Sequence, residues 1–206
     1  EETRGFIVHE DLLCQHSPFF TAAVKKEWEE GQDRVVRLPD DSINAVNLYV
    51  NWIYSHKIFS RRAPSEDDRP SSELGDLVDA FVFGEKVQDG RFKDAVLDAV
   101  IKSPTIPDKN NTRQYPGEQI IDYAYRGTPP GSPLRRLMVD FWARHSSDGW
   151  LRTDMNTDFL ADLVRELVLL RRPQLELHPS DGSLSTCSYH QHGNDQGCYS
   201  RDDDEV

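Results

Sequence analysis

The feature that most constrains the fold of this chain is a stripe of apolar residues with helical spacing. Leu74, Leu77, Val78, Phe81 and Val82 stand at positions i, i+3, i+4, i+7 and i+8, so an α-helix brings them all to one face. Such a face needs a core to pack against, because each large apolar side chain that leaves water stabilises the fold by about 1.5–3 kcal/mol. The stripe therefore predicts a helix that is buried along one face.

Further segments have the same periodicity and predict more helices. Their apolar residues are, in chain order, Ile43, Val46, Val50 and Ile53; Phe92, Ala95, Val96, Ala99 and Val100; Leu134, Leu137, Met138, Phe141 and Trp142; and Phe159, Leu160, Leu163, Val164, Leu167 and Val168. Shorter helix signals occur between Glu10 and Val24, where Ser17-Pro18 is typical of a helix start. Asp41 or Ser42 can cap the helix that follows.

Two short segments instead have the composition of β-strands. Phe6-Ile7-Val8 is a continuous apolar run. Arg34-Val35-Val36-Arg37-Leu38 alternates in polarity, contains β-branched residues and stops at Pro39. Both patterns favour strands, so the sequence predicts an α+β fold rather than a purely helical one.

The composition divides the chain into three parts. Residues 1–103 hold most of the periodic apolar residues, and residues 104–177 open with a proline-containing linker before the last two predicted helices. Residues 178–206 are rich in Ser, Asp, Gly, His and Gln with almost no aliphatic residues. They bury too little apolar surface to offset an ordering cost of roughly 1–2 kcal/mol per residue. We expect this third part to be a disordered acidic tail.

The net charge and the absence of targeting signals limit the classes of partner and the cellular location that we expect. Lys and Arg number 24 against 36 Asp and Glu, a net charge of −12, and a field of this sign repels nucleic-acid phosphates. No apolar run approaches the roughly 20 residues that span a bilayer, and no signal peptide is visible. Three scattered cysteines do not form a disulfide framework. We expect an intracellular protein of the cytoplasm or nucleus, with no nucleic-acid or membrane partner.

The chain has none of the short motifs that indicate common catalytic sites. There is no Gly-rich phosphate loop, no Gly-x-Ser-x-Gly and no His-Glu-x-x-His, since His9-Glu10 is followed by Asp11-Leu12-Leu13. The paired carboxylates Asp40-Asp41 stand at a predicted helix start, where capping and the helix dipole explain them. We therefore expect no enzymatic activity, no cofactor and no small-molecule ligand.

One group of residues in the tail has the chemistry of a zinc site. Cys187, His190, His192 and Cys198 are ligand types that suit zinc, and they lie within one short span. Their spacing fits no standard zinc finger, and no apolar residues follow that could form its small core. A disordered tail with incidental ligands is the preferred interpretation, and zinc binding by these residues stays an open alternative.

Six segments of the first part follow one another in a characteristic order. They are Phe6-Ile7-Val8-His9-Glu10-Asp11-Leu12-Leu13, Ser17-Pro18-Phe19-Phe20, Val36-Arg37-Leu38-Pro39-Asp40-Asp41, Tyr49-Val50-Asn51-Trp52-Ile53-Tyr54, Phe81-Val82-Phe83-Gly84-Glu85-Lys86-Val87 and Phe92-Lys93-Asp94-Ala95. Together they resemble the BTB/POZ domain, in the form that is common in filamentous fungi. The resemblance implies that residues 1–103 form a BTB/POZ domain, small and mainly helical with a short three-stranded sheet. A helical extension would follow over residues 104–177. The family's usual first strand has no counterpart before Phe6.

BTB/POZ domains are interaction modules, so the resemblance implies protein binding. The leading prediction is a substrate adaptor that bridges a cullin-type ubiquitin ligase scaffold to its substrate. Family adaptors carry a hydrophobic-x-Glu element after the second helix, and Trp28-Glu29-Glu30 stands in that place. Trp28 and Glu30 are therefore the predicted cullin contacts, although Trp28 could instead cover the local core. The alternative is a self-associating scaffold or transcription-linked regulator without a ligase role.

Overall fold

The computed structural model describes residues 4–25, 33–60, 71–105, 111, 113–152, 154–170 and 189–191. Within these residues every regular element is a helix. In chain order the elements are α1 (Glu10–His16), α2 (Pro18–Ala23), α4 (Ile43–Ser55), α5 (Ser71–Val87), α6 (Gly90–Lys102), the 3-10 turn η1 (Ser103–Thr105), α7 (Glu118–Gly127), α8 (Pro133–His145), the 3-10 turn η2 (Asp148–Trp150) and α9 (Thr157–Leu170).

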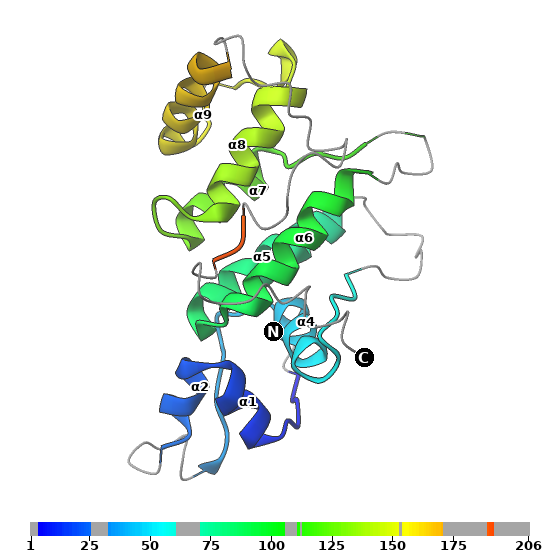
Figure 1. Ribbon diagram of the computed structural model, residues 1–206, viewed down its shortest axis with the longest axis vertical. Helices are drawn as coiled ribbons and strands as arrows, with labels where there is room; N and C mark the ends of the chain where they lie inside the picture. Colours follow the sequence, from blue (N-terminus) through cyan, green and yellow to red (C-terminus); the bar gives the residue numbers. More distant parts are fainter. Residues whose placement is uncertain are drawn as a thin grey trace.

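The helices form an elongated molecule with α5 and α6 at its middle (Figure 1). Helix α5 packs against α4, α6 and α7, and it also contacts α2. The pair α1 and α2 lies at one end, while α8 and α9 lie at the other and pack against each other and against α7. Most of the helices therefore contact either α5 or its neighbour α7 directly.

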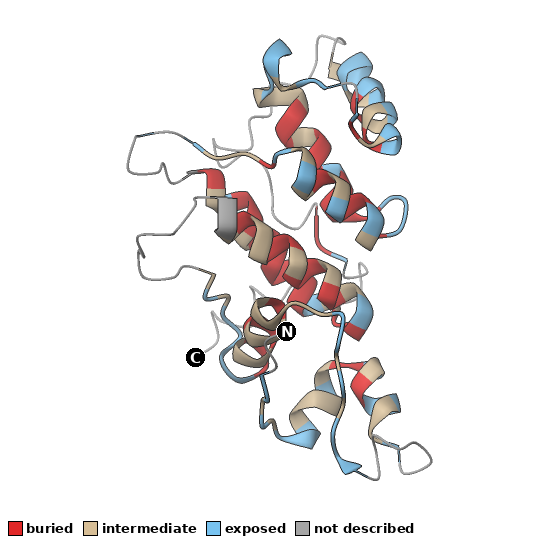
Figure 2. Ribbon diagram, turned by 180° about the vertical axis from the view of Figure 1, so that it is seen from behind, coloured by how far each residue is buried: buried red, intermediate tan, exposed pale blue. Residues whose placement is uncertain are grey.

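The helix that the apolar stripe predicts is confirmed as α5, and it is buried on more sides than the stripe indicates. Leu74, Leu77, Val78 and Phe81 are all buried, as expected. Ala80 and Phe83 are buried as well, and they lie between the stripe positions on the helix. Figure 2 shows many of the buried residues along α5 and α6, and others along α8. The additional burial follows from the packing of α5 against several helices at once.

Aromatic side chains fill the core between α4 and the α5–α6 pair. The ring of Tyr49 lies 4.9 Å from that of Phe92 and 5.5 Å from that of Phe83, both in edge-on geometry. Trp52 on the same helix is fully buried. Ser42 caps the start of helix α4, because its hydroxyl accepts a 3.5 Å hydrogen bond from the Ala45 amide. The predicted helix and one of its two predicted caps are thus confirmed.

The second half of the chain has its own aromatic cluster. The Trp142 ring of α8 lies 5.4 Å from Phe159 of α9 and 5.4 Å from Trp150. Its indole N–H donates to the Pro116 carbonyl at 2.8 Å. The two predicted helices here are confirmed as α8 and α9. Helix α7 was not predicted, although Ile121 and its neighbours give it a short apolar face.

The predicted α+β fold with a three-stranded sheet is wrong, because no described residue lies in a β-strand. The segments 6–8 and 35–38 are non-helical, but within the described residues no backbone hydrogen bond joins them. A β-branched pattern favours an extended backbone, whereas a sheet also needs a paired ladder. The His9 amide donates instead to the Tyr54 hydroxyl at 3.1 Å. Val8, Val36 and Leu38 pack their side chains on the helical core.

The segment predicted as a disordered tail is described at only three positions. Residues 189–191 lie against the body of the molecule, and Tyr189 is buried. The remaining residues of 178–206 lie outside the described residues. Among the described helices, none has both the length and the apolar character needed to cross a membrane.

Helix α7 approaches α5 closely at a glycine. A Cβ atom built on Gly127 would lie 2.6 Å from Cγ2 and 2.7 Å from Cγ1 of Val82. Carbon atoms in contact stand about 3.5–4.0 Å apart, so the absence of a side chain at Gly127 sets how near the two helices come. Gly75 of α5, in contrast, has no neighbouring atom within 4 Å of its Cβ position.

Two alanine substitutions should have opposite effects on stability. Gly127→Ala should lower the free energy of unfolding by about 1–3 kcal/mol, because Val82 has to move to admit the new methyl group. Gly75→Ala should raise it by about 0.5–1 kcal/mol, because alanine loses less conformational freedom than glycine when a helix forms. Urea unfolding of the full chain measures both. If Gly127→Ala stabilised the protein as much as Gly75→Ala, the close approach of α7 to Val82 would be refuted.

Candidate functional site

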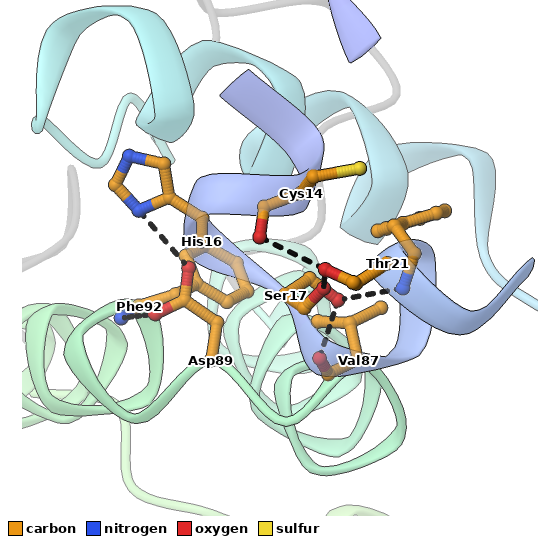
Figure 3. A network of polar contacts seen from close by, with 8 residues as sticks. Cys14, His16, Ser17, Thr21, Val87, Asp89 and Phe92 are labelled. Atoms are coloured by element: carbon orange, nitrogen blue, oxygen red, sulfur yellow. Dashed lines mark hydrogen bonds and ion pairs between the residues drawn. The ribbon is translucent and has the colours of Figure 1, made fainter. Parts of the chain in front are cut away.

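A buried polar cluster connects α1 and α2 to the junction of α5 and α6 (Figure 3). Its members are His16, Ser17, Tyr49, Asp89 and Trp52. Ser17 and Asp89 are buried, and buried polar groups of this kind are stable only where they find partners. The contacts of Ser17, Asp89 and His16 show what the cluster can do.

Ser17 caps one helix and binds the end of another. Its Oγ accepts a hydrogen bond from the Phe20 amide at 3.1 Å, which caps the start of α2. The same hydroxyl donates to the carbonyl of Val87, the last residue of α5, at 2.6 Å. The Ser17-Pro18 signal therefore predicted the helix start correctly, while the link to Val87, 70 residues away, has no signature in the sequence.

Asp89 has the corresponding position at the start of α6. Its Oδ1 accepts from the Phe92 amide at 2.9 Å, and its Oδ2 lies 3.6 Å from Nδ1 of His16. Burial raises the pKa of Asp89, and the hydrogen bond from the Phe92 amide and the nearby His16 only partly offset that effect. The sequence indicated a helix break at Asp89-Gly90 but not that this carboxyl group meets a histidine from α1.

The pKa of His16 is shifted in the opposite direction to that of Asp89. Burial lowers the pKa of His16, and the Asp89 carboxylate works against that shift. His56 and Arg91 lower the pKa further through charge repulsion. The His56 ring lies 5.6 Å from the His16 ring. The cluster thus favours a neutral imidazole next to a partly desolvated carboxyl group.

Serine, histidine and aspartate also occur together in hydrolase triads, but here the arrangement differs. A catalytic serine gives its proton to a histidine that the acid orients. The Ser17 hydroxyl instead donates to a main-chain carbonyl, and the residue is fully buried. This geometry suits the joining of helix ends rather than the activation of a nucleophile.

The residues predicted as a binding site lie outside the described residues. This applies to Trp28 and Glu30, and to Cys187, His192 and Cys198 of the possible zinc group. His190 is described, and its Nε2 lies 3.0 Å from Oδ1 of Asp98. Across the described residues, no group of three or more His, Cys, Asp or Glu side chains could hold a metal ion.

The clearest surface feature is the outer face of α9. Phe159 and Leu163 are buried against α7 and α8, whereas Val164, Leu167 and Val168 keep 60%, 40% and 53% of their surface exposed. Figure 2 shows α9 at the edge of the molecule with much of its surface exposed. The sequence predicted the apolar stripe of this helix, and the structure buries only part of it.

Comparisons with models of protein families, with curated proteins and with solved structures find no match to this chain. The resemblance to BTB/POZ domains therefore stays a prediction from the six sequence segments.

The buried histidine should make stability depend on pH. Because the pKa of His16 is lowered in the folded state, the unfolded chain takes up this proton more readily. The contribution of His16 is fully present above about pH 6.5 and is lost as the pH falls below that value. Relative to a His16→Gln variant, the parent protein should lose stability between about pH 7 and pH 5. Urea unfolding across this range measures the difference, in which the other titrating groups largely cancel. A difference that stays constant with pH would contradict the prediction.

Proposed function

We propose that this chain is a protein–protein interaction module. The observation that carries the proposal is the outward apolar face of α9, formed by Val164, Leu167 and Val168. These residues stand at i, i+3 and i+4, the spacing by which an amphipathic helix presents anchor side chains to a partner. Apolar side chains grouped in this way on a surface indicate an interaction site more strongly than the same side chains scattered singly.

The surroundings of this face resemble the rim of an interface. Arg165 is exposed beside it and pairs with Asp162 on the same helix at 2.8 Å. The Asp162 carboxylate also accepts a 3.0 Å hydrogen bond from the Tyr125 hydroxyl of α7. An apolar centre with charged residues at its edge is the usual anatomy of protein interfaces. The link from Tyr125 holds α9 in place without using the outer apolar side chains.

The net charge of −12 adds a preference among partners. A strongly acidic chain attracts basic surfaces and raises the rate at which they associate, and salt weakens this effect. The proposed partner is therefore a protein that offers an apolar groove with basic residues near it.

The α9 face should be needed for partner binding but not for folding. In a pull-down with the full chain as bait, Val164→Asp with Val168→Asp should reduce recovery of the specific partner at least tenfold, since apolar anchors at interface centres are often worth about 2 kcal/mol or more. The melting temperature should change little, because both side chains are already exposed.

The matched control adds the same two charges at exposed polar positions away from α9, with Gln119→Asp and Ser147→Asp. This control should recover the partner as the parent does. Equal recovery of every bound protein by the α9 variant and the parent would refute the role of this face.

A narrower proposal names the partner as a cullin-type scaffold. It is supported by the six sequence segments that resemble BTB/POZ domains and by the position of Trp28-Glu29-Glu30 after the second helix. The three-stranded sheet that the resemblance implied is not part of its support. The alternative without a ligase role, a self-associating scaffold or transcription-linked regulator, is kept as an outcome of the same experiment.

Binding to a purified cullin N-terminal domain tests the narrower proposal. Trp28→Ala should weaken binding roughly thirtyfold if the indole fills an apolar pocket, and Glu30→Ala should weaken it less, as expected for a carboxylate at the rim. Isothermal titration measures both, with urea unfolding to show that the variants are folded. Loss of several kcal/mol of stability in Trp28→Ala would identify Trp28 as a core residue instead. A parent chain that self-associates without binding cullin would favour the alternative.

A further inference from the structure

Two carboxylates of α6 are buried in the interior of the molecule. Asp94 and Asp98 stand one helical turn apart and are only 2% and 6% exposed. A carboxylate removed from water needs hydrogen-bond donors in exchange. For both residues, donors come from a segment more than 90 positions further along the chain.

Residues 189–191, here called the docked segment, supply these donors one after another. The Gln191 amide donates to Oδ1 of Asp94 at 2.7 Å, and Nε2 of His190 lies 3.0 Å from Oδ1 of Asp98. The Tyr189 hydroxyl donates to the carboxylate of Asp140 on α8. The segment lies between α6 and α8 (Figure 1). Asp94, Asp98 and Asp140 together are called the acidic docking surface below.

Each residue of the docked segment contacts a different carboxylate of the acidic docking surface. Three successive residues present a phenol, an imidazole and a main-chain amide, and each meets one carboxylate. The Tyr189 ring is buried within the apolar core. Burial and the Asp140 carboxylate raise the pKa of the Tyr189 hydroxyl, so the hydroxyl remains a donor. Hydrogen bonds to charged groups have stricter geometry and greater strength than neutral ones.

The docked segment differs from the helices in how it is held. Helix α9 is fixed by Phe159 and Leu163, whose exposure would be unfavourable. The docked segment is held by hydrogen bonds to three carboxylates and by one buried apolar ring, that of Tyr189. Eighteen residues, 171–188, separate it from the end of α9. A peptide with the same donors could therefore exchange with it.

We propose that the acidic docking surface is a peptide-binding site, that the docked segment occupies it within the chain, and that a partner peptide presenting Tyr-His displaces this segment. The proposal goes beyond the function proposed above, because it adds a second, internally blocked surface that does not depend on the α9 face. The three carboxylates favour a peptide that carries a tyrosine followed by hydrogen-bond donors and little negative charge. Occupation from within the same chain would lower the apparent affinity of the partner.

The experiment uses a fluorescent peptide with the sequence of residues 188–194, Ser-Tyr-His-Gln-His-Gly-Asn. It is titrated against the full chain and against a full-chain Tyr189→Phe/His190→Ala variant, with binding followed by fluorescence anisotropy. The variant should bind the peptide at least tenfold more tightly than the parent, because its own segment no longer competes at the effective concentration of roughly 1 mM that a short tether provides. A peptide with the same two substitutions should bind neither protein.

Further variants locate the site. In the Tyr189→Phe/His190→Ala background, Asp98→Ala and Asp140→Ala should each lower peptide affinity at least tenfold, whereas Asp158→Ala, at an exposed position on α9, should not change it. If the double variant fails to fold, Tyr189→Phe alone replaces it, since this change keeps the ring and removes only the donor.

The proposal is overturned if the folded variant does not bind the peptide at about 1 mM, the tether's effective concentration, or binds it no better than the parent. Peptide binding that is unaffected by Asp98→Ala and Asp140→Ala also overturns it. The α9 experiment uses a different surface and different variants, so failure here leaves the interaction module intact. Failure of α9 in the pull-down likewise leaves this site intact.

Discussion

The burial of α5 is the constraint on which the rest of the structure depends. This helix contacts α2, α4, α6 and α7, so its sequence has to satisfy several packing surfaces at once. The requirement explains why apolar and small residues extend around it, and why α7 meets it at a glycine. Protein interiors are packed as densely as organic crystals. A substitution at one of these contacts therefore also disturbs the packing of the helices on the other sides of α5.

Polar groups then join the remaining helices to this centre. Ser17 uses one hydroxyl to cap α2 and to bind the last carbonyl of α5, and Asp89 caps α6 two residues later in the chain than Val87. The cost of burying Asp89 is visible in its raised pKa. Because His16 lies beside it, the attachment of α1 depends on a pair in which burial disfavours the charged form of each member.

Periodicity in the sequence was sufficient to predict the long helices and insufficient for the rest. Helices α4, α5, α6, α8 and α9 each show the 3.6-residue repeat, which is a local property of the chain. The extended segments around Ile7 and Val35 have strand composition, but pairing depends on a distant partner and not on composition, so the predicted sheet was wrong. Helix α7 was missed because its apolar face is short, with Ile121, Ala124 and Tyr125 as its buried residues.

The site residues were harder to predict for a related reason. The Ser17-Pro18 cap is a local signal, whereas the contacts of Ser17 with Val87 and of His16 with Asp89 cross some 70 residues. Nothing in the composition near Tyr189 distinguishes it from the polar residues that surround it. Tyr189 is buried in the apolar core and donates to Asp140 of α8, so its role becomes visible only once the helices are positioned.

The long separation of the docked segment from its acceptors also orders events during synthesis and folding. Residues 190 and 98 are 92 positions apart, and residues 191 and 94 are 97 apart. Closing a loop of this length is entropically less favourable than forming the local contacts within the helices. On a ribosome, the residues of α6 and α8 are synthesised before Tyr189, so the three carboxylates of the acidic docking surface exist before the segment that binds them. The docked segment can therefore reach its acceptors only after the helices that carry them have been made.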